Sequence, residues 1–310
     1  MALTINKENI QDIILSGNID DYPEGIILPV DKPYRWTSAD VIRKIKFCAC
    51  RHFHKKNLKV GHAGTLDPLA TGVLLVCIGK ATKCAEELQK HEKEYIAGIS
   101  FGATTPSYDL EKDIDMHYPL DGVSEEALRG VIPGFIGEQE QVAPLFSAKS
   151  IDGVRAYELA RKEWKRMKDS EGGFDHSATD TLNKQWINIT EMELLRFCPD
   201  GLPEDNMEMD SNEFSSTKNN DGTENFRNSR INVTDNSALH LPHADIRVAC
   251  SKGTYVRALA RDLGEALGSG AHLDGLRRTR TGGFKASEAL TVAQAILFFA
   301  QRRNNDGKVI

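Results

Sequence analysis

The chain is built around the segment Lys59-Val60-Gly61-His62-Ala63-Gly64-Thr65-Leu66-Asp67-Pro68-Leu69-Ala70-Thr71-Gly72. Its glycines, its proline and its threonines leave no room for a regular helix or strand, so we expect a loop. The apolar run that follows, residues 73–78, predicts a buried strand. A loop clamped between strands can hold one reactive side chain rigidly. This loop contains a single carboxylate, Asp67, and a single imidazole, His62.

Asp67 admits several interpretations. A carboxylate in a tight loop can act as a nucleophile, as a general base or as a metal ligand, or it can simply cap a turn. A metal needs further ligands, and the loop offers only His62. A nucleophile has to stay ionised, which an arginine partner favours, and Arg257 is our candidate for that partner. The spacing alone leaves the nucleophile and the turn cap equally open.

Two rival sites are weaker. Residues 79–82 (Gly-Lys-Ala-Thr) resemble part of a phosphate-binding loop. That motif needs Ser or Thr directly after the lysine and another glycine where Leu74 stands, so the comparison fails. Residues 48–54 (Cys-Ala-Cys-Arg-His-Phe-His) hold four possible zinc ligands. Ligands two residues apart on a helix point in different directions, so we expect a helix end and no metal site there.

Composition places the chain among ordinary globular proteins, and 310 residues suffice for a sizeable core. No apolar run approaches the roughly 20 residues that span a bilayer. The N-terminal residues do not have the pattern of a signal peptide. The six cysteines are scattered through apolar patterns and are typical of reduced thiols. We therefore expect a cytoplasmic protein without a membrane partner.

The formal net charge of −6 is unevenly distributed along the chain. Residues 199–236 hold nine acidic and three basic residues, so the rest of the chain is neutral overall. Residues 32–59, in contrast, hold nine basic residues and one acidic residue. A concentrated basic segment is the electrostatic footprint of a polyanion site, although it also fits a solvated helix face.

Hydrophobic periodicity predicts more strands than an alternating βαβ fold would have. Strands are expected at residues 25–33, 73–78, 93–101, 186–195 and 244–250, with a β-bulge near Thr190 where the alternation changes phase. Helices are expected after Thr37 or Ser38 and at residues 80–91, 124–131, 154–162, 254–267 and 291–300. The predicted fold class is α+β, with a single mixed, largely antiparallel β-sheet flanked by helices and loops.

We divide the chain into an N-terminal extension (residues 1–24), a main domain (25–290), and a C-terminal helix and tail (291–310). Residues 199–240 interrupt the main domain. They lack periodicity and hold few apolar residues, so they cannot bury enough surface to offset the entropy of ordering. We expect this acidic insertion to be disordered.

Several segments of the sequence, taken in order, resemble the TruB family of tRNA pseudouridine synthases. They are VDKP at 30–33, GHAGTLDPLATG at 61–72, KEY at 93–95, PLFSAK at 144–149 with GVRAYE at 153–158, SKGTYVR at 251–257, and GAHL at 270–273 with LRR at 276–278. The similarity runs from about residue 25 to residue 285. Its central motif is long, which makes the resemblance highly specific.

The resemblance implies the pseudouridine synthase fold and a reaction without cofactor or metal: isomerisation of uridine 55 in the T-loop of tRNA to pseudouridine. It assigns Asp67 as the nucleophile, attacking either the uracil or the anomeric carbon of the ribose. Tyr95 would pack on the target base, and Arg257 would pair with Asp67. His62 would fill the space that the flipped-out nucleotide leaves in the stack.

The resemblance also implies further contacts with RNA. Tyr255 and Leu276 would line the uracil pocket, and Lys32 and Lys149 would support the site by charge or hydrogen bonding. The basic run at residues 43–59 can hold phosphates, together with Arg277, Arg278, Arg280 and Lys285. The expected partner is the T-arm of tRNA, bound by a monomer.

The sequence departs from the family pattern in three ways, one of which is the extra insertion at residues 199–240. Family members often carry an acidic residue early in the loop after the Tyr95 strand, whereas this loop has only Asp109. Many relatives also have a small C-terminal RNA-binding domain of the PUA type, which we expect to be absent in this short form. The alternative function is a non-catalytic RNA-binding or tRNA-folding protein. Asp67 argues against it, because a lone carboxylate facing polyanionic RNA weakens binding.

Overall fold

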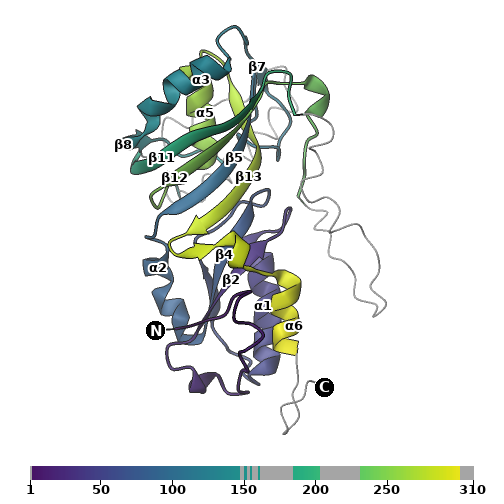
Figure 1. Cartoon of the computed structure of the whole chain (residues 1–310). Helices are drawn as coiled ribbons and strands as arrows, with labels where there is room; N and C mark the ends of the chain where they lie inside the picture. The colour runs from purple at the N-terminus through teal and green to yellow at the C-terminus, as the bar shows by residue number, and fades with distance from the viewer. Residues whose placement is uncertain are drawn as a thin grey trace. The chain divides into compact units, whose positions relative to one another are not determined.

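The computed structural model describes residues 2–146, 150–151, 154–155, 160, 184–202 and 231–300 (Figure 1). It consists of two compact units. Unit 1 comprises Met1–Tyr95 and Arg277–Ile310, and unit 2 comprises Ile96–Leu276. The chain passes between them within two strands, β5 (Lys93–Phe101) and β13 (Ala271–Thr281). No helix in these described ranges has the length and apolarity needed to cross a membrane.

Unit 1 is centred on the antiparallel pair β2 (Ile26–Lys32) and β4 (Thr71–Ile78). Both strands are almost entirely buried, as the continuous apolar runs predict. Parallel strands flank them, namely β1 (Leu3–Thr4) and β15 (Leu290–Thr291) on β2 and the end of β13 on β4. The pairing is therefore mixed. The N-terminal extension contributes β1 and the fully buried Ile5 to this unit.

Helix α1 (Ser38–His52) begins at Thr37, one of the two caps that the sequence predicts, and the structure shows a capping box there. The Thr37 hydroxyl accepts from the Asp40 amide at 3.0 Å, and the Asp40 carboxylate accepts from the Thr37 amide at 3.0 Å. Helix α6 (Val292–Ala300) packs beside α1 within unit 1 (Figure 1). His52, weighed above as a zinc ligand, instead bonds the Phe299 and Ser16 carbonyls at 3.2 and 3.1 Å. Among the described residues, no three metal-ligating side chains gather at one point.

Three local predictions were wrong. Part of the central segment forms strand β3 (Val60–Ala63), because its four residues pair antiparallel with Leu75–Ile78 of β4. The helix expected at 80–91 is a 3-10 turn, η2 (Gly79–Cys84), followed by the short helix α2 (Ala85–Leu88). The helix expected from residue 154 starts instead as strand β10 (Val154–Arg155), which pairs with β9 (Ser150–Ile151).

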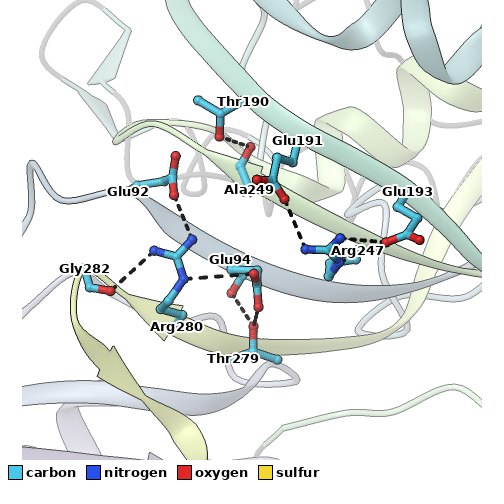
Figure 2. Close-up of polar contacts among 10 residues, drawn as sticks. All are labelled: Glu92, Glu94, Thr190, Glu191, Glu193, Arg247, Ala249, Thr279, Arg280 and Gly282. Carbon is cyan, nitrogen blue, oxygen red and sulfur yellow. Dashed lines mark hydrogen bonds and ion pairs between the residues drawn. The ribbon is translucent and has the colours of Figure 1, made fainter.

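Unit 2 carries the strand order β13-β5-β12-β11-β8, from β12 (His243–Cys250) through β11 (Gln185–Cys198) to β8 (Gly137–Gln141). The bulge predicted near Thr190 is confirmed by the register shift between Ile189 and Glu191. Figure 2 shows the Thr190 hydroxyl turned back to donate to the Ala249 carbonyl at 3.2 Å. These strands and those of unit 1 belong to one mixed sheet, which confirms the α+β class.

The described part of unit 2 includes the α-helices α3 and α5. Helix α3 (Glu125–Val131) begins at Ser124, whose hydroxyl accepts from the Ala127 amide at 3.1 Å as its sequence predicts. Helix α5 (Val256–Ala266) ends before Gly268, which has a φ of 65°. This left-handed conformation is the usual way for a glycine to close a helix.

The acidic insertion lies only partly within the described residues. Residues 203–230 fall outside them, whereas residues 231–240 are described. The Thr234 amide donates to the Leu110 carbonyl at 2.8 Å, and its hydroxyl bonds Asp113 at 2.9 Å. The Asn236 amide group lies 3.4 Å from His272. This flank of the insertion therefore packs on the loop that follows β5.

A buried charge cluster sits in unit 2 around His243, which is 2% exposed. Its Nδ1 lies 2.6 Å from Asp274 and its Nε2 lies 3.2 Å from Asp245. Ser100 donates to Asp274 at 2.6 Å, and Arg196 bonds Asp245 at 2.8 Å. Burial alone would lower the pKa of His243, but hydrogen bonds and charge from the two aspartates raise it to about 9. The imidazole is therefore charged at neutral pH.

Replacing this histidine by His243→Gln is expected to change how stability depends on pH. The stabilisation from the raised pKa is fully present below the unfolded pKa near 6.5 and is lost as pH rises through about 9. It amounts to about 3 kcal/mol. Urea unfolding of both proteins from pH 6 to 10 should show the wild-type advantage shrinking across this window. A difference that does not vary with pH would contradict the charged state of His243.

Candidate active site

Asp67 lies in unit 1, in the loop that joins β3 to β4. The loop leaves β3 at Gly64, whose φ of 95° favours glycine, and turns again where the Ala70 amide donates to the Asp67 carbonyl at 3.1 Å. No helix or strand holds the residues between them. The position of the Asp67 carboxylate therefore depends on side chains that bind this backbone.

The first such side chain is Ser38, at the start of α1. Its hydroxyl accepts from the Leu66 amide at 3.0 Å and donates to the Leu66 carbonyl at 3.1 Å. Ser38 is 3% exposed, so water does not compete for these bonds. The sequence predicted Thr37 or Ser38 as the helix cap. With Thr37 in that role, Ser38 fixes the residue immediately before Asp67.

Lys32 holds the residue after Asp67. Its ammonium lies at the end of β2, is 0% exposed, and donates to the carbonyls of Pro33 at 2.9 Å, Trp36 at 2.6 Å and Pro68 at 3.2 Å. The first two carbonyls belong to the turn that leads into α1. The Lys32 ammonium therefore ties that turn to the loop of Asp67.

Two opposing effects set the protonation of Lys32. Burial lowers its pKa to about 7, while the nearby Asp67 carboxylate raises it. The hydrogen-bond geometry also favours the charged form, because an ammonium has three protons for three carbonyls and a neutral amine has two. These hydrogen bonds favour the charged form of Lys32, which places a cation near the Asp67 carboxylate.

Arg278 on β13 binds backbone carbonyls near both ends of the Asp67 loop. The guanidinium donates to the carbonyls of Val73 at 2.8 Å, Gly64 at 3.0 Å and Thr65 at 3.5 Å. It is 1% exposed. The expectation that Arg278 holds RNA phosphates was wrong, because a buried guanidinium with three carbonyl partners is not presented to a polyanion.

Gly72 allows Arg278 to come this close. It has a φ of 101°, and a Cβ added there would lie 2.1 Å from the Arg278 carbonyl oxygen. We expect Gly72→Ala to destabilise the protein by about 3 kcal/mol or more, because both the backbone angle and the β4–β13 contact must give way. Gly130→Ala in α3 is the matched control, since a Cβ there meets nothing within 4 Å. Urea unfolding should separate the two variants, and equal stabilities would contradict this packing.

His62 and Tyr95 also belong to unit 1. His62 is half-buried in β3, and burial together with Arg278 lowers its pKa, so the ring is neutral at pH 7. Its Nδ1 is buried without a hydrogen-bond partner among the described residues. Tyr95 is buried in β5. Figure 2 shows the Thr279 hydroxyl bound to Glu94, next to Tyr95, through its carbonyl at 3.2 Å and its carboxylate at 2.7 Å.

Arg277 already has a protein partner. Its guanidinium binds both carboxylate oxygens of Asp31, at 2.7 and 3.2 Å, and is 39% exposed. Asp31 immediately precedes Lys32 on β2. This pair links β13 to β2, so a phosphate at Arg277 would have to compete with Asp31. Its role in substrate binding stays a prediction.

Arg257 lies in unit 2, on the first turn of α5. It donates to the carbonyls of Ser107 at 2.9 Å and Phe146 at 3.0 Å, and its Nε lies 3.8 Å from the Asp109 carboxylate. Ser107 in turn donates to Asp109 at 2.6 Å. The sequence offered no role for Asp109. The structure shows that Asp109 and Ser107 fasten Arg257 to the loop after β5.

Three further residues, Tyr255, Leu276 and Lys149, were predicted to contact the substrate. Tyr255 is fixed by its backbone, whose amide donates to the Gln141 side chain at 2.8 Å and whose carbonyl accepts from it at 3.2 Å. Leu276 is half-buried on β13. Lys149 lies outside the described residues. Because Asp67 is in unit 1 and Arg257 is in unit 2, their pairing stays a prediction.

Comparison with known families places this loop in context. The model for "TruB family pseudouridylate synthase (N terminal domain)" matches residues 51–172, which include Asp67 and Tyr95. The model for "tRNA pseudouridylate synthase B C-terminal domain" matches residues 257–308. The chain belongs to the TruB family of pseudouridylate synthases.

TruB relatives are similar over nearly their whole length. A protein from Phocaeicola vulgatus is 44% identical over 88% of this chain and 92% of its own, and one from Flavobacterium johnsoniae is 36% identical over 88% and 95%. Both are named tRNA pseudouridine synthase B.

A solved structure also resembles the TruB chain. The crystal structure of a Cbf5-Nop10-Gar1 complex contains a chain with a TM-score of 0.50 and 25% identity. The match covers 86% of this chain and 52% of that one. It supports the pseudouridine synthase fold that the sequence resemblance implied.

Proposed function

We propose that this protein isomerises uridine 55 in the T-loop of tRNA to pseudouridine, acting in the cytoplasm as a monomer. Its relatives named tRNA pseudouridine synthase B support the reaction and the class of RNA. The proposal rests mainly on Asp67, the single carboxylate of the central loop, and on how firmly its backbone is held. Three buried polar side chains, Lys32, Ser38 and Arg278, bind the backbone on both sides of Asp67. An RNA-binding protein without catalytic activity has no use for a carboxylate held in this way.

The reaction requires a nucleophile and the release and return of the base. The Asp67 carboxylate attacks either the uracil ring or the anomeric carbon, and the bond between N1 and the ribose breaks. The base turns and forms a bond from its C5 to the anomeric carbon. C5 then loses its proton, N1 takes up a proton in exchange, and the bond to Asp67 breaks, so the product is an isomer of the substrate. No redox step occurs, and every electron pair is accounted for within RNA and protein.

The surrounding residues have proposed roles in this sequence. Tyr95 packs on the target base and assists removal of its C5 proton. Arg257 pairs with Asp67 and keeps it ionised. The neutral ring of His62 takes the place of the extruded base, because a neutral aromatic ring stacks without the cost of desolvating a charge. Tyr255 and Leu276 line the pocket of the extruded uracil.

Mapping of pseudouridine in a reacted tRNA transcript tests the proposed position. Wild-type protein should convert uridine 55 to completion and leave the other uridines unchanged. A transcript with cytidine at position 55 should bind and remain unmodified. Pseudouridine at another position, or in the transcript that lacks uridine 55, would contradict the proposed T-loop specificity.

A further inference from the structure

Arg280, near the end of β13, binds the beginning of strand β5. Its guanidinium lies 2.7 Å from the Glu92 carboxylate and 4.0 Å from the Glu94 carboxylate, and it donates to the Gly282 carbonyl at 3.4 Å (Figure 2). All four residues belong to unit 1. A phosphate at Arg280 would therefore have to compete with two carboxylates that already face the guanidinium.

Arg280 and the ring of Tyr95 lie on opposite faces of β5. Successive side chains of a strand point to opposite faces, and Glu94 immediately precedes Tyr95 in this strand. The Glu94 side chain faces Arg280, so the Tyr95 ring points the other way, where it is 9% exposed. Any effect of Arg280 on Tyr95 therefore has to pass through the backbone of β5.

Thr279 contacts the peptide group that joins Glu94 to Tyr95. Its hydroxyl lies 2.7 Å from the Glu94 carboxylate and 3.2 Å from the Glu94 carbonyl oxygen. A hydroxyl has one proton, so it bonds one of these acceptors at a time, and the charged carboxylate makes the stronger bond. With Arg280 and Thr279 both bound to its side chain, Glu94 fixes the backbone one residue before Tyr95.

Lys93 fixes the same stretch from the face that carries Tyr95. Its ammonium is 6% exposed and donates to the carbonyls of Gln89 and His91, the latter at 2.6 Å. Gln89 caps the end of α2, so this contact satisfies a carbonyl that the helix leaves unpaired. Each residue from 92 to 94 is therefore held by a side-chain contact before the chain reaches Tyr95.

We propose that Arg280 is a positioning residue, whose ion pairs with Glu92 and Glu94 hold the start of β5 so that Tyr95 meets the target base in a reactive geometry. The inference rests on the proposed function, which gives Tyr95 its contact with the base. Arg280 itself touches neither the base nor a backbone phosphate. Rates depend steeply on placement, because a displacement of about 1 Å costs on the order of 100-fold. Partly exposed ion pairs contribute little to folding stability, so the protein should lose rate while it stays folded.

The test measures single-turnover rates and tRNA binding for Arg280→Gln and for the double variant Glu92→Gln, Glu94→Gln. The two variants remove the same ion pairs from opposite sides. We expect both to lower the rate at saturating enzyme roughly tenfold to hundredfold. The affinity for tRNA should stay within about threefold of wild type, with the same salt dependence. All three substitutions together should cost no more than Arg280→Gln alone, because they remove one shared interaction.

Arg247→Gln is the matched control for Arg280→Gln. Arg247, on β12 in unit 2, also binds two glutamates, Glu191 at 3.1 Å and Glu193 at 2.6 Å (Figure 2). Its side chain is 35% exposed, and that of Arg280 is 29% exposed. The two substitutions therefore remove the same kind of contact at similar burial. Arg247→Gln should keep its rate within twofold of wild type.

The variants Thr279→Val and Thr279→Ser test the contact with Glu94 separately. Serine keeps the hydroxyl, whereas valine keeps the shape of threonine without it. The valine variant should therefore react severalfold more slowly than the serine variant, with equal affinity for tRNA. Equal rates in the two variants would contradict the role given to this contact.

A phosphate contact at Arg280 would give the opposite pattern. Arg280→Gln would then weaken tRNA binding and flatten its salt dependence with little effect on the saturated rate, and removing the two glutamates would tighten binding. That pattern would overturn the proposal, as would equal losses of rate in Arg280→Gln and Arg247→Gln. Failure of the proposed function looks different, because wild-type protein would then bind tRNA and form no pseudouridine.

Discussion

Asp67→Asn should abolish pseudouridine formation while the protein still folds and binds tRNA. We expect the rate to fall on the order of 10⁴-fold or more, which is the scale for removing a covalent nucleophile. Asparagine has nearly the same shape and can still pack in the loop, but its amide cannot form the ester bond that the reaction needs. Nucleoside analysis of digested tRNA measures the product directly.

Binding of tRNA should stay the same or become tighter in this variant. Replacing Asp67 removes a negative charge that faces a polyanion. Asp20→Asn is the matched control, because Asp20 lies in unit 1, is 75% exposed and pairs with the surface residue Lys55. The control should keep its full rate. Equal rates for Asp67→Asn and wild type would show that Asp67 is a turn cap, the alternative that spacing leaves open.

Lys32→Met should lower turnover by more than its loss of stability explains. The substitution leaves the carbonyls of Pro33, Trp36 and Pro68 without their buried donor, and each unsatisfied carbonyl costs about 1–3 kcal/mol. It also removes the cation beside Asp67. We expect a loss of stability of about 3 kcal/mol or more. Turnover should fall on the order of 100-fold, because small misplacements of a reacting group have effects of that size.

The control for Lys32→Met is Leu28→Ala on the same strand. Leu28 is 0% exposed, and truncating a buried leucine costs about 2–5 kcal/mol. The two variants should therefore unfold at similar urea concentrations. At a temperature where both are folded, Leu28→Ala should turn over tRNA nearly as fast as wild type. A parallel loss of rate in both variants would mean that Lys32 acts through general stability and not through the loop of Asp67.

Much of the fold could be predicted from local patterns. The apolar run that became β4, the capping box of α1 and the phase change that became the bulge at Thr190 each follow from side chains close together in the sequence. Strand β13 could not be predicted in this way. Gly275, Asp274 and a run of arginines obscure its alternation, and its pairing depends on partners distant in the sequence.

In the candidate site, too, some residues could be identified from the sequence and others only from the structure. Asp67 stands out because it is the one carboxylate in a rigid loop. The roles of Lys32, Ser38 and Arg278 could not be derived, because each acts by binding backbone carbonyls or amides, and sequence does not show where those groups point. Arg278 illustrates the difficulty: an arginine on a basic strand indicates RNA contact until its burial is known.

Release of the C5 hydrogen tests the central claim most directly. A tRNA transcript labelled with tritium at C5 of its uridines is mixed with excess enzyme, and the label released to water is counted over time. We expect wild-type protein to release one uridine label per tRNA and Asp67→Asn to release none while it binds the same transcript. Release by Asp67→Asn at the wild-type rate would contradict the assignment of Asp67 as the nucleophile.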